Sequence, residues 1–348
     1  MGNNLMRAHR ELYSRRPDER FATLDDLWKH CQTSQASSRD RWSPPTDMAV
    51  KATERGLHLS VRDEPLDLND WSFSQLCTLS GISKETVNRL SPQTASRVFA
   101  ETLPSGTKPL QVFTTADTVR SIHGASYTRL HDLELLSIVR EFAVDFVPAQ
   151  KALTAEGDNA PAATGLYCGE QDMFCFLIDP TGWIEIDDEA FAPGFFLWNS
   201  EVGRRSVGIE TFWFQAICQN HIVWDAVEVV KFSRKHTANV RDALTQTRQL
   251  IEQLVAKRDQ RRDSFAQVVR KAMQTKLGTD NEEAMKVLTQ HGITRSLANE
   301  ALKIAEQQGR LTIFAVVNAL TRIARQLQNA GDRTAADMKS ASLLALAA

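Results

Sequence analysis

Two strongly apolar runs between residues 194 and 224 flank one dense polar turn, and this is the clearest pattern along the chain. The first run, FFLW at 195–198, leads into NSEVG at 199–203, whose short polar side chains and glycine favour a reversal of the backbone. In the second run, apolar and polar positions alternate with a period of two before becoming continuously apolar at 212–214. The segment therefore predicts a β-hairpin in the core of a sheet.

Similar patterns predict the other elements and an α+β fold. Apolar runs predict strands at 109–115, 118–122, 166–168, 173–178, 183–186 and 227–232. Helical spacing predicts helices at 131–146, 239–276, 281–290, 295–307, 311–328 and 334–346. The segments 34–45 and 151–164 are small, polar and proline-containing, which favours loops. We therefore expect a small antiparallel sheet core with packed helices over 101–236, a helical N-terminal region over 1–100, and a largely helical C-terminal region over 237–348.

Residues 74–90 have the spacing of a helix-turn-helix. Cys77 permits close helix packing, Gly81 allows the turn, and Val87 anchors a second helix. That helix would present Lys84, Asn88 and Arg89 to a DNA major groove. The alternative is an ordinary helix hairpin, because any tight hairpin needs small residues at these positions.

Several motifs resemble one known family. The first is NSEVG, which is followed by a hydrophobic strand and a Cys-x-Asn pair. Two others are RSIHGASYTR at 120–129 and NALT at 318–321. FATLDDL at 21–27 and DWSFSQLCTLSGI at 70–82 resemble the family's opening helices more loosely. Together they resemble the phage- and plasmid-encoded domain-of-unknown-function family 932 over most of the chain from about residue 21. The resemblance implies a mobile-element setting, with roles in replication, recombination or defence evasion. The motif residues to which it gives structural importance are Asn199, Ser200, Glu201, Gly203, Cys218, Asn220, Asn318 and Thr321.

Composition describes an ordinary globular chain, with 348 residues of which 42% are hydrophobic and 24% charged. No apolar run approaches a membrane span, and the first residues lack the apolar core of a signal peptide, so we expect a cytoplasmic protein. The 5 cysteines include no C-x-x-C pair, which favours reduced, mostly buried thiols.

Charge is unevenly distributed although the formal net charge is only −2. Residues 231–276 hold 12 basic and 4 acidic residues, so the remainder of the chain is strongly acidic. Such asymmetry indicates a surface that faces a polyanion, with a solvated helix face as the alternative.

Catalytic signals are weak. The acidic residues Asp179, Glu185, Asp187, Asp188 and Glu189 suggest a metal-dependent nuclease, but no lysine follows at the spacing of a restriction-type site, and a solvated acidic turn is favoured. The histidines lack metal-ligand spacing, Cys218 with His221 has no third group, and the chain has no P-loop. We expect no catalytic residues, no cofactor and no metal.

Binding to single-stranded DNA is then the preferred function, with duplex DNA or RNA as further ligands. A homo-oligomer would hold one strand by its phosphates and leave the bases free to anneal with a complementary strand. Tyr127, Trp198 or Trp213 would offer stacking faces. The candidate cationic and stacking contacts are Arg120, Tyr127, Arg129, Arg204, Arg205, Lys231, Arg234, Lys235, Lys257, Arg258, Arg261 and Arg262.

Other interpretations remain open at this point. Arg120 and Arg129 have the alternative of ion pairs with Glu201 or Asp132, and the aromatic residues of strand runs are usually core. Asn318 and Thr321 share a helix face and favour a buried polar contact. The competing functions are a helix-turn-helix regulator and a protein-binding accessory factor that acts on a host system.

Overall fold

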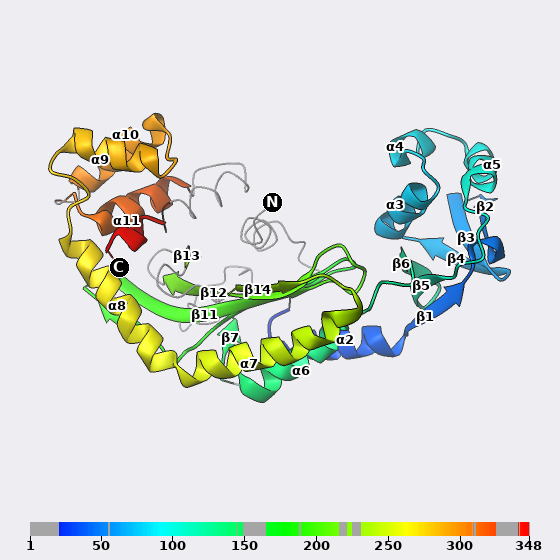
Figure 1. Cartoon of the computed structure of the whole chain (residues 1–348), viewed down its shortest axis with the longest axis horizontal. Helices are drawn as coiled ribbons and strands as arrows, with labels where there is room; N and C mark the ends of the chain where they lie inside the picture. Colours follow the sequence, from blue (N-terminus) through cyan, green and yellow to red (C-terminus); the bar gives the residue numbers. More distant parts are fainter. Residues whose placement is uncertain are drawn as a thin grey trace.

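The computed structural model describes residues 21–54, 56–143, 145–148, 165–187, 189–215, 221–224, 231–307, 309, 311–324, 340 and 342–347. These residues form an elongated α+β structure, which confirms the predicted fold class. One mixed sheet lies at one end, a long curved sheet lies in the middle, and a group of helices lies at the other end (Figure 1).

The N-terminal sheet has the strand order β1-β5-β6-β4-β3-β2 within the described residues. Its pairs are antiparallel except for β4 with β6, which are parallel. The strands are β1 (Ser38–Ser43), β2 (Met48–Thr53), β3 (Gly56–Val61), β4 (Glu64–Leu68), β5 (Leu110–Thr115) and β6 (Thr118–His123). Helices α3 (Asp70–Leu79), α4 (Lys84–Val87) and α5 (Pro92–Thr102) pack on this sheet around Leu59, Leu76 and Phe99.

The prediction of a helical region over 1–100 is wrong for residues 38–68, which form β1 to β4. The segment 34–45, expected to be a loop, contains the end of α2 (Leu24–Ala36) and the edge strand β1. One reason for this error is that the turn between β3 and β4 lacks the usual sequence signal of a hairpin. Arg62 and Asp63 occupy it with φ of 48° and 64°, a conformation usually marked by Asn-Gly. The expected division at residue 100 also separates β5 and β6 from the strands with which they pair.

The central sheet is built around the predicted hairpin. β11 (Glu189–Asn199) pairs with β12 (Val207–Gln215), and β11 also pairs with β9 (Met173–Ile178). The main path is β13-β12-β11-β9-β7, with β10 beside β11, β14 beside β12 and β8 beside β9. The remaining strands are β7 (Val147–Pro148), β8 (Leu166–Cys168), β10 (Ile184–Ile186), β13 (His221–Trp224) and β14 (Lys231–Arg234).

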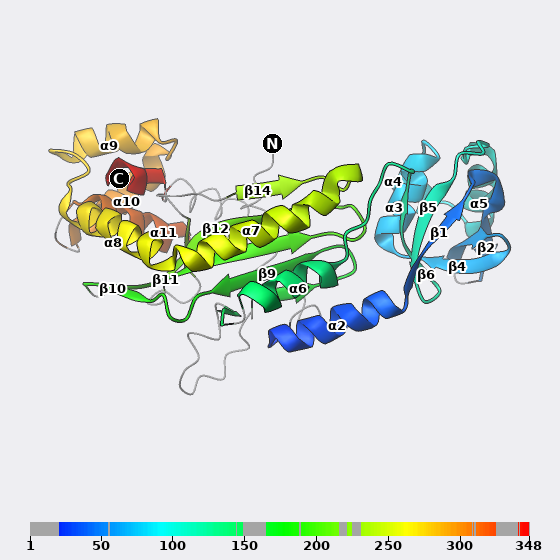
Figure 2. The same ribbon diagram turned by 60° about the horizontal axis from the view of Figure 1, so that its bottom comes forward.

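One face of the central sheet carries α2, α6 (Asp132–Phe142) and α7 (Asp242–Ala256), which run along it in Figures 1 and 2. Because successive side chains of a strand point to opposite faces, Phe195 and Leu197 join the core beneath these helices, and Phe196 and Trp198 point to the other face. Trp198 lies over Gly208, where an added Cβ would come within 2.1 Å of the indole. Both faces of the hairpin are buried, as predicted for the continuously apolar residues 212–214.

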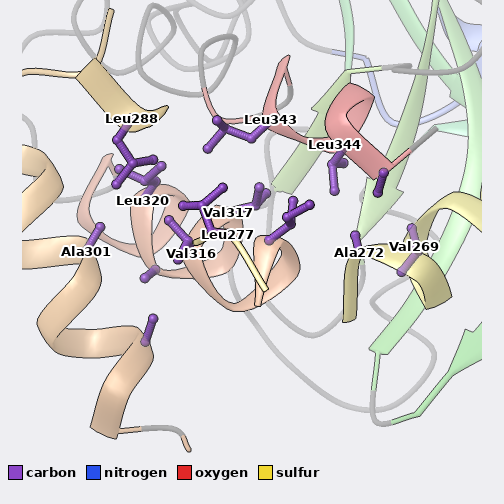
Figure 3. Close-up of a cluster of buried hydrophobic side chains, with 14 of the residues drawn as sticks. Val269, Ala272, Leu277, Leu288, Ala301, Val316, Val317, Leu320, Leu343 and Leu344 are labelled. Carbon is purple, nitrogen blue, oxygen red and sulfur yellow. The ribbon is translucent and has the colours of Figure 1, made fainter. Parts of the chain in front are cut away.

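The C-terminal region is helical over its described residues, as predicted. The single long helix expected at 239–276 is divided at Lys257, whose φ of −100° and ψ of 12° end α7 before α8 (Arg258–Gln274) begins. Then follow α9 (Asn281–Gln290), α10 (Arg295–Gln307) and α11 (Ile313–Ala324). Their apolar side chains, with Leu343 and Leu344, form one buried cluster (Figure 3). The predicted loop at 151–164 lies outside the described residues, as does most of the helix expected at 334–346.

Among the helices that the structure describes, none is long and apolar enough to cross a membrane.

Candidate functional site

Residues 199–203, the turn of the central hairpin, are held by side chains from β6 and from the segment that joins β6 to α6. We call residues 199–203 with Arg120, Tyr127 and Arg129 the turn cluster. Arg120 Nη1 lies 2.8 Å from Glu201 Oε2, and the Tyr127 hydroxyl donates to the Glu201 carbonyl at 2.9 Å. Arg129 also donates to the Glu201 carbonyl. The motif residues at 120–129 and 199–203 therefore meet, although about 80 positions separate them.

Glu201 is the centre of the turn cluster. Its Oε1 accepts from the Asp132 backbone N–H at 3.1 Å and lies 3.1 Å from His131 Nδ1, and its Oε2 faces Arg120. Burial by itself would raise the pKa of Glu201, but the contacts with His131 and Arg120 outweigh it and hold that pKa below the usual value. Burial and the nearby Glu201 charge raise the pKa of Asp132. Glu201 is therefore the more acidic member of this pair of carboxyl groups.

Arg129 is a buried structural cation with 5% of its surface exposed. Its Nη2 lies 2.7 Å from Asp40 Oδ1, and its guanidinium carbon lies 3.6 Å from the Phe113 ring centroid. Arg205 forms a similar buried pair, with 2.6 Å between its Nε and Asp172 Oδ2. Arg129 is therefore in a structural ion pair, which was the alternative to phosphate contact. Its partner Asp40, and Asp172 as the partner of Arg205, were not indicated by any sequence pattern.

Tyr127 stacks on two histidine rings. The ring centroids of His123 and Tyr127 lie 3.7 Å apart, and those of Tyr127 and His236 lie 5.5 Å apart. Burial lowers the pKa of both histidines to about 4, and the Arg129 charge contributes to this lowering. Because the Tyr127 ring already stacks on these two rings, it is a packing group and not an open stacking face for a base.

Trp198 and Trp213, the other expected stacking residues, are 2% and 1% exposed. Trp213 stacks on Phe265 of α8 with 4.0 Å between ring centroids. Both indoles are core groups: Trp213 joins the sheet to α8, and Trp198 packs within the hairpin against Phe196 and Gly208.

Gly203 completes the turn with a φ of 73°. A Cβ at this position would lie 2.7 Å from His123 Cε1 and 2.9 Å from Tyr127 Cε2. The carbonyl of Val202 accepts from Trp71 Nε1 of α3 and contacts His123 Nε2, each at 2.9 Å. The turn cluster therefore attaches the central hairpin to the N-terminal sheet.

The second pair of motif residues lies elsewhere. Asn318 of α11 donates to Glu189 Oε1 at 3.2 Å, and Gln215 donates to Glu189 Oε2 at 2.6 Å. Thr321 is buried beside them at a cavity of about 10 Å³. These contacts tie α11 to β11 and β12 and match the predicted buried polar role. Cys218 and Asn220 lie outside the described residues.

The other candidate cations are mostly at the surface. Arg204, Arg234, Lys235 and Lys257 are exposed, and Arg262 is half-buried. Arg204 lies over the Trp71 ring, and Arg234 contacts Gln246. The side chains of Lys231, Arg258 and Arg261 lie outside the described residues.

The positive charge of residues 231–276 is offset by acidic partners to different extents along the segment. Arg241, directly before α7, pairs with Glu134 at 3.5 Å, and Arg248 of α7 pairs with Glu141 at 2.8 Å; both carboxylates are on α6. Residues 257–276, which span α8, hold 7 basic and 2 acidic residues. Both acidic residues, Asp259 and Asp263, contact Arg262. Of the two parts of this segment, residues 257–276 therefore keep the larger excess of positive charge.

The helix-turn-helix expectation is met only in part. Gly81 turns the chain with a φ of 67°, and Cys77 and Val87 are buried as expected. The second helix, α4, has only 4 residues, and the Lys84 ammonium contacts the Asp70 carboxylate. One turn of helix is too short to act as a recognition helix in a major groove.

The acidic residues near 179–189 do not assemble a metal site in the described part of the chain. Asp179 is buried and accepts from the backbone and hydroxyl of Thr181 at 2.9 and 2.7 Å. Glu185 and Asp187 are exposed, the Asp188 side chain is not described, and Glu189 bonds Gln215 and Asn318. These are the contacts of turns and helix packing.

The described cysteines, Cys31, Cys77, Cys168 and Cys175, are buried, as predicted, and none of them is in a disulfide. Two of them meet Asp132 beside the turn cluster, an arrangement that no local spacing indicated because 137 positions separate Cys31 from Cys168.

Comparisons of the chain with protein-family models, curated proteins and solved structures found no match. The resemblance to family 932 therefore stays a prediction that rests on the quoted motifs.

Proposed function

We propose that the protein binds single-stranded nucleic acid, DNA in the first place, through the outer face of α8, and that it promotes strand annealing. The observation that carries this proposal is the charge of residues 257–276, where 7 basic residues face 2 acidic ones. These residues carry a net charge of +5, and both acidic side chains contact Arg262.

The position of α8 supports the proposal. Phe265, Val269 and Ala272 bury one side of the helix against the sheet and the C-terminal helices. Arg270 and Lys271 are exposed on the opposite side, and Lys276 is exposed just beyond the helix end. A helix that is fixed in this way presents its cations on a rigid surface, which lowers the entropic cost of contacting phosphates.

The proposed contact is with the backbone alone. The three expected stacking residues are covered, so affinity comes from phosphate neutralisation and base edges stay accessible for pairing. Binding of this kind is independent of sequence and falls steeply as salt rises. Assembly into a homo-oligomer and a role in the recombination or replication of a phage or plasmid belong to the same proposal.

The first test compares fluorescent single-stranded and duplex oligonucleotides of unrelated sequence at low and high salt, with particle size followed in parallel. We expect salt-sensitive single-strand binding with large assemblies, and faster annealing of complementary strands. An absence of binding to either form at low salt would exclude the proposal and direct the search to a host protein partner.

A charge-reversal variant locates the surface. Arg270→Glu with Lys276→Glu should weaken binding at least tenfold, because it removes two cations and adds two anions on and next to α8. The matched control is Lys286→Glu with Lys303→Glu, which makes the same charge change at exposed positions of α9 and α10. Equal losses in the two variants would show that net charge, and not α8, governs binding.

A further inference from the structure

Three side chains of types that bind metals in other proteins meet in the interior beside the turn cluster. Cys31 Sγ lies 4.0 Å from Cys168 Sγ, and Cys168 Sγ lies 3.8 Å from Asp132 Oδ2. The ligand atoms of Cys31, Asp132 and Cys168 all lie within 4.8 Å of one another. In the part of the chain that the structure describes, this is the one group of at least three such side chains placed so closely.

The Asp132 carboxylate is oriented toward the two thiols by contacts on its other side. Asn199 Nδ2 donates to Asp132 Oδ1 at 2.8 Å and to the Leu130 carbonyl at 2.9 Å. Glu201 fixes the Asp132 backbone through its N–H. One carboxylate oxygen is therefore held by the protein while the other faces sulfur. Supporting hydrogen bonds of this kind are characteristic of the groups that surround metal ligands.

The spacing fits a small divalent ion. With Zn–S near 2.3 Å and Zn–O near 2.0–2.2 Å, a tetrahedral site separates its ligand atoms by about 3.5–3.8 Å. The observed distances of 4.0 and 3.8 Å exceed this by a few tenths of an ångström, and the third pair, Cys31 with Asp132, lies within 4.8 Å. Closing the site therefore needs side-chain rotations that move the ligand atoms by about 1 Å or less. A disulfide, by contrast, needs the sulfur atoms at about 2.05 Å.

We propose that Cys31, Asp132 and Cys168 bind a zinc ion. Two thiolates favour a soft or borderline metal over magnesium or calcium, and the carboxylate supplies the third ligand. The fourth position of the tetrahedron is left to a non-protein ligand. This site is independent of the proposed nucleic-acid surface on α8.

Zinc at this position would join three separate parts of the fold. Cys31 lies on α2, Asp132 begins α6, and Cys168 lies on β8. Through Asn199 and Glu201, Asp132 also contacts the turn cluster. The ion would thus act as a structural link, and its binding free energy would add to the stability of the fold.

The test uses the full chain, purified with a reductant and then freed of metal with a chelator. Titration with Co²⁺ should give a thiolate-to-metal absorption band that saturates at one equivalent, and Zn²⁺ should displace it. Excess Zn²⁺ should raise Tm by about 5 °C or more. The variants Cys31→Ser and Cys168→Ser should lose the band, and Asp132→Asn should weaken binding at least tenfold.

Cys77→Ser is the matched control, because Cys77 is equally buried but lies in the core of the N-terminal sheet. It should keep the Co²⁺ band and the Zn²⁺ effect on Tm. Circular dichroism of each variant identifies those that fail to fold. The proposal would be overturned if the wild type bound metal no more strongly than a folded Cys31→Ser or Cys168→Ser variant. A disulfide between Cys31 and Cys168 under reducing conditions would overturn it as well.

Discussion

Arg120 and Glu201 form a buried ion pair, with 2.8 Å between Nη1 and Oε2 and side-chain exposures of 12% and 6%. Arg120 comes from β6 of the N-terminal sheet and Glu201 from the turn of the central hairpin. The pair therefore fixes two separate sheets to each other. Since phosphate binding needs an exposed guanidinium, this arrangement assigns Arg120 a structural role and leaves nucleic-acid contact to other cations.

Loss of this ion pair should destabilise the protein strongly. Arg120→Ala leaves the Glu201 carboxylate buried with only His131 and a backbone N–H as partners, and breaking such pairs costs about 3–5 kcal/mol. Urea unfolding followed by circular dichroism measures the change. The control is Arg248→Ala, which removes a pair of the same 2.8 Å length whose side chains are 49% and 51% exposed. We expect the control to cost about 1 kcal/mol or less, and similar losses in both would refute the structural role.

Gly203→Ala should destabilise the turn for two reasons. The φ of 73° is unfavourable for alanine, and the added methyl group would contact the His123 and Tyr127 rings at 2.7 and 2.9 Å. We expect a loss of about 2 kcal/mol or more in the free energy of unfolding. Gly106→Ala is the control, since nothing lies within 4 Å of its added Cβ. A neutral effect at Gly203 would show that the turn relaxes around a side chain.

His123 and His236 should make the fold sensitive to acid. Burial holds the pKa of each at about 4 in the folded state, below the ordinary value of 6.5, so the unfolded chain binds more protons between these values. Their contribution is complete above pH 6.5 and is lost as pH falls through this window toward 4. Each histidine contributes about 3 kcal/mol by this linkage.

A double variant isolates this effect from other titrating groups. His123→Asn with His236→Asn removes both rings, so its stability should fall less than that of the wild type between about pH 7 and about pH 4.5. Urea unfolding at several pH values in this range gives the difference. Parallel pH profiles for the two proteins would contradict the assignment.

Sequence patterns predicted the elements whose signals are local. The hairpin β11–β12 follows from its alternation and its polar turn, and α6, α9 and α10 follow from helical spacing. The ion pair of Arg120 with Glu201 was one of two interpretations, because opposite charges in a sequence do not indicate which of them meet.

Features set by tertiary contacts escaped prediction. β1 carries arginines and an aspartate because it is an edge strand, so it lacks the apolar pattern of a core strand. The Arg62–Asp63 turn lacks the glycine that marks most hairpins. Asp40, Asp172 and the Cys31–Asp132–Cys168 group meet their partners only through the packing of distant elements.

The salt dependence of single-strand binding should identify the cations of α8 directly. Removing one cation that neutralises a phosphate lowers the slope of log K against log salt by about 0.7 for single strands. Arg270→Glu with Lys276→Glu removes two exposed cations, so the slope should fall by about 1.4 or more, with no new sequence preference. The control Lys286→Glu with Lys303→Glu lowers overall charge equally but should leave the slope nearly unchanged, because α9 and α10 lie outside the proposed surface. Fluorescence titrations at several salt concentrations measure both slopes, and an unchanged slope in the α8 variant would move the binding surface away from this helix.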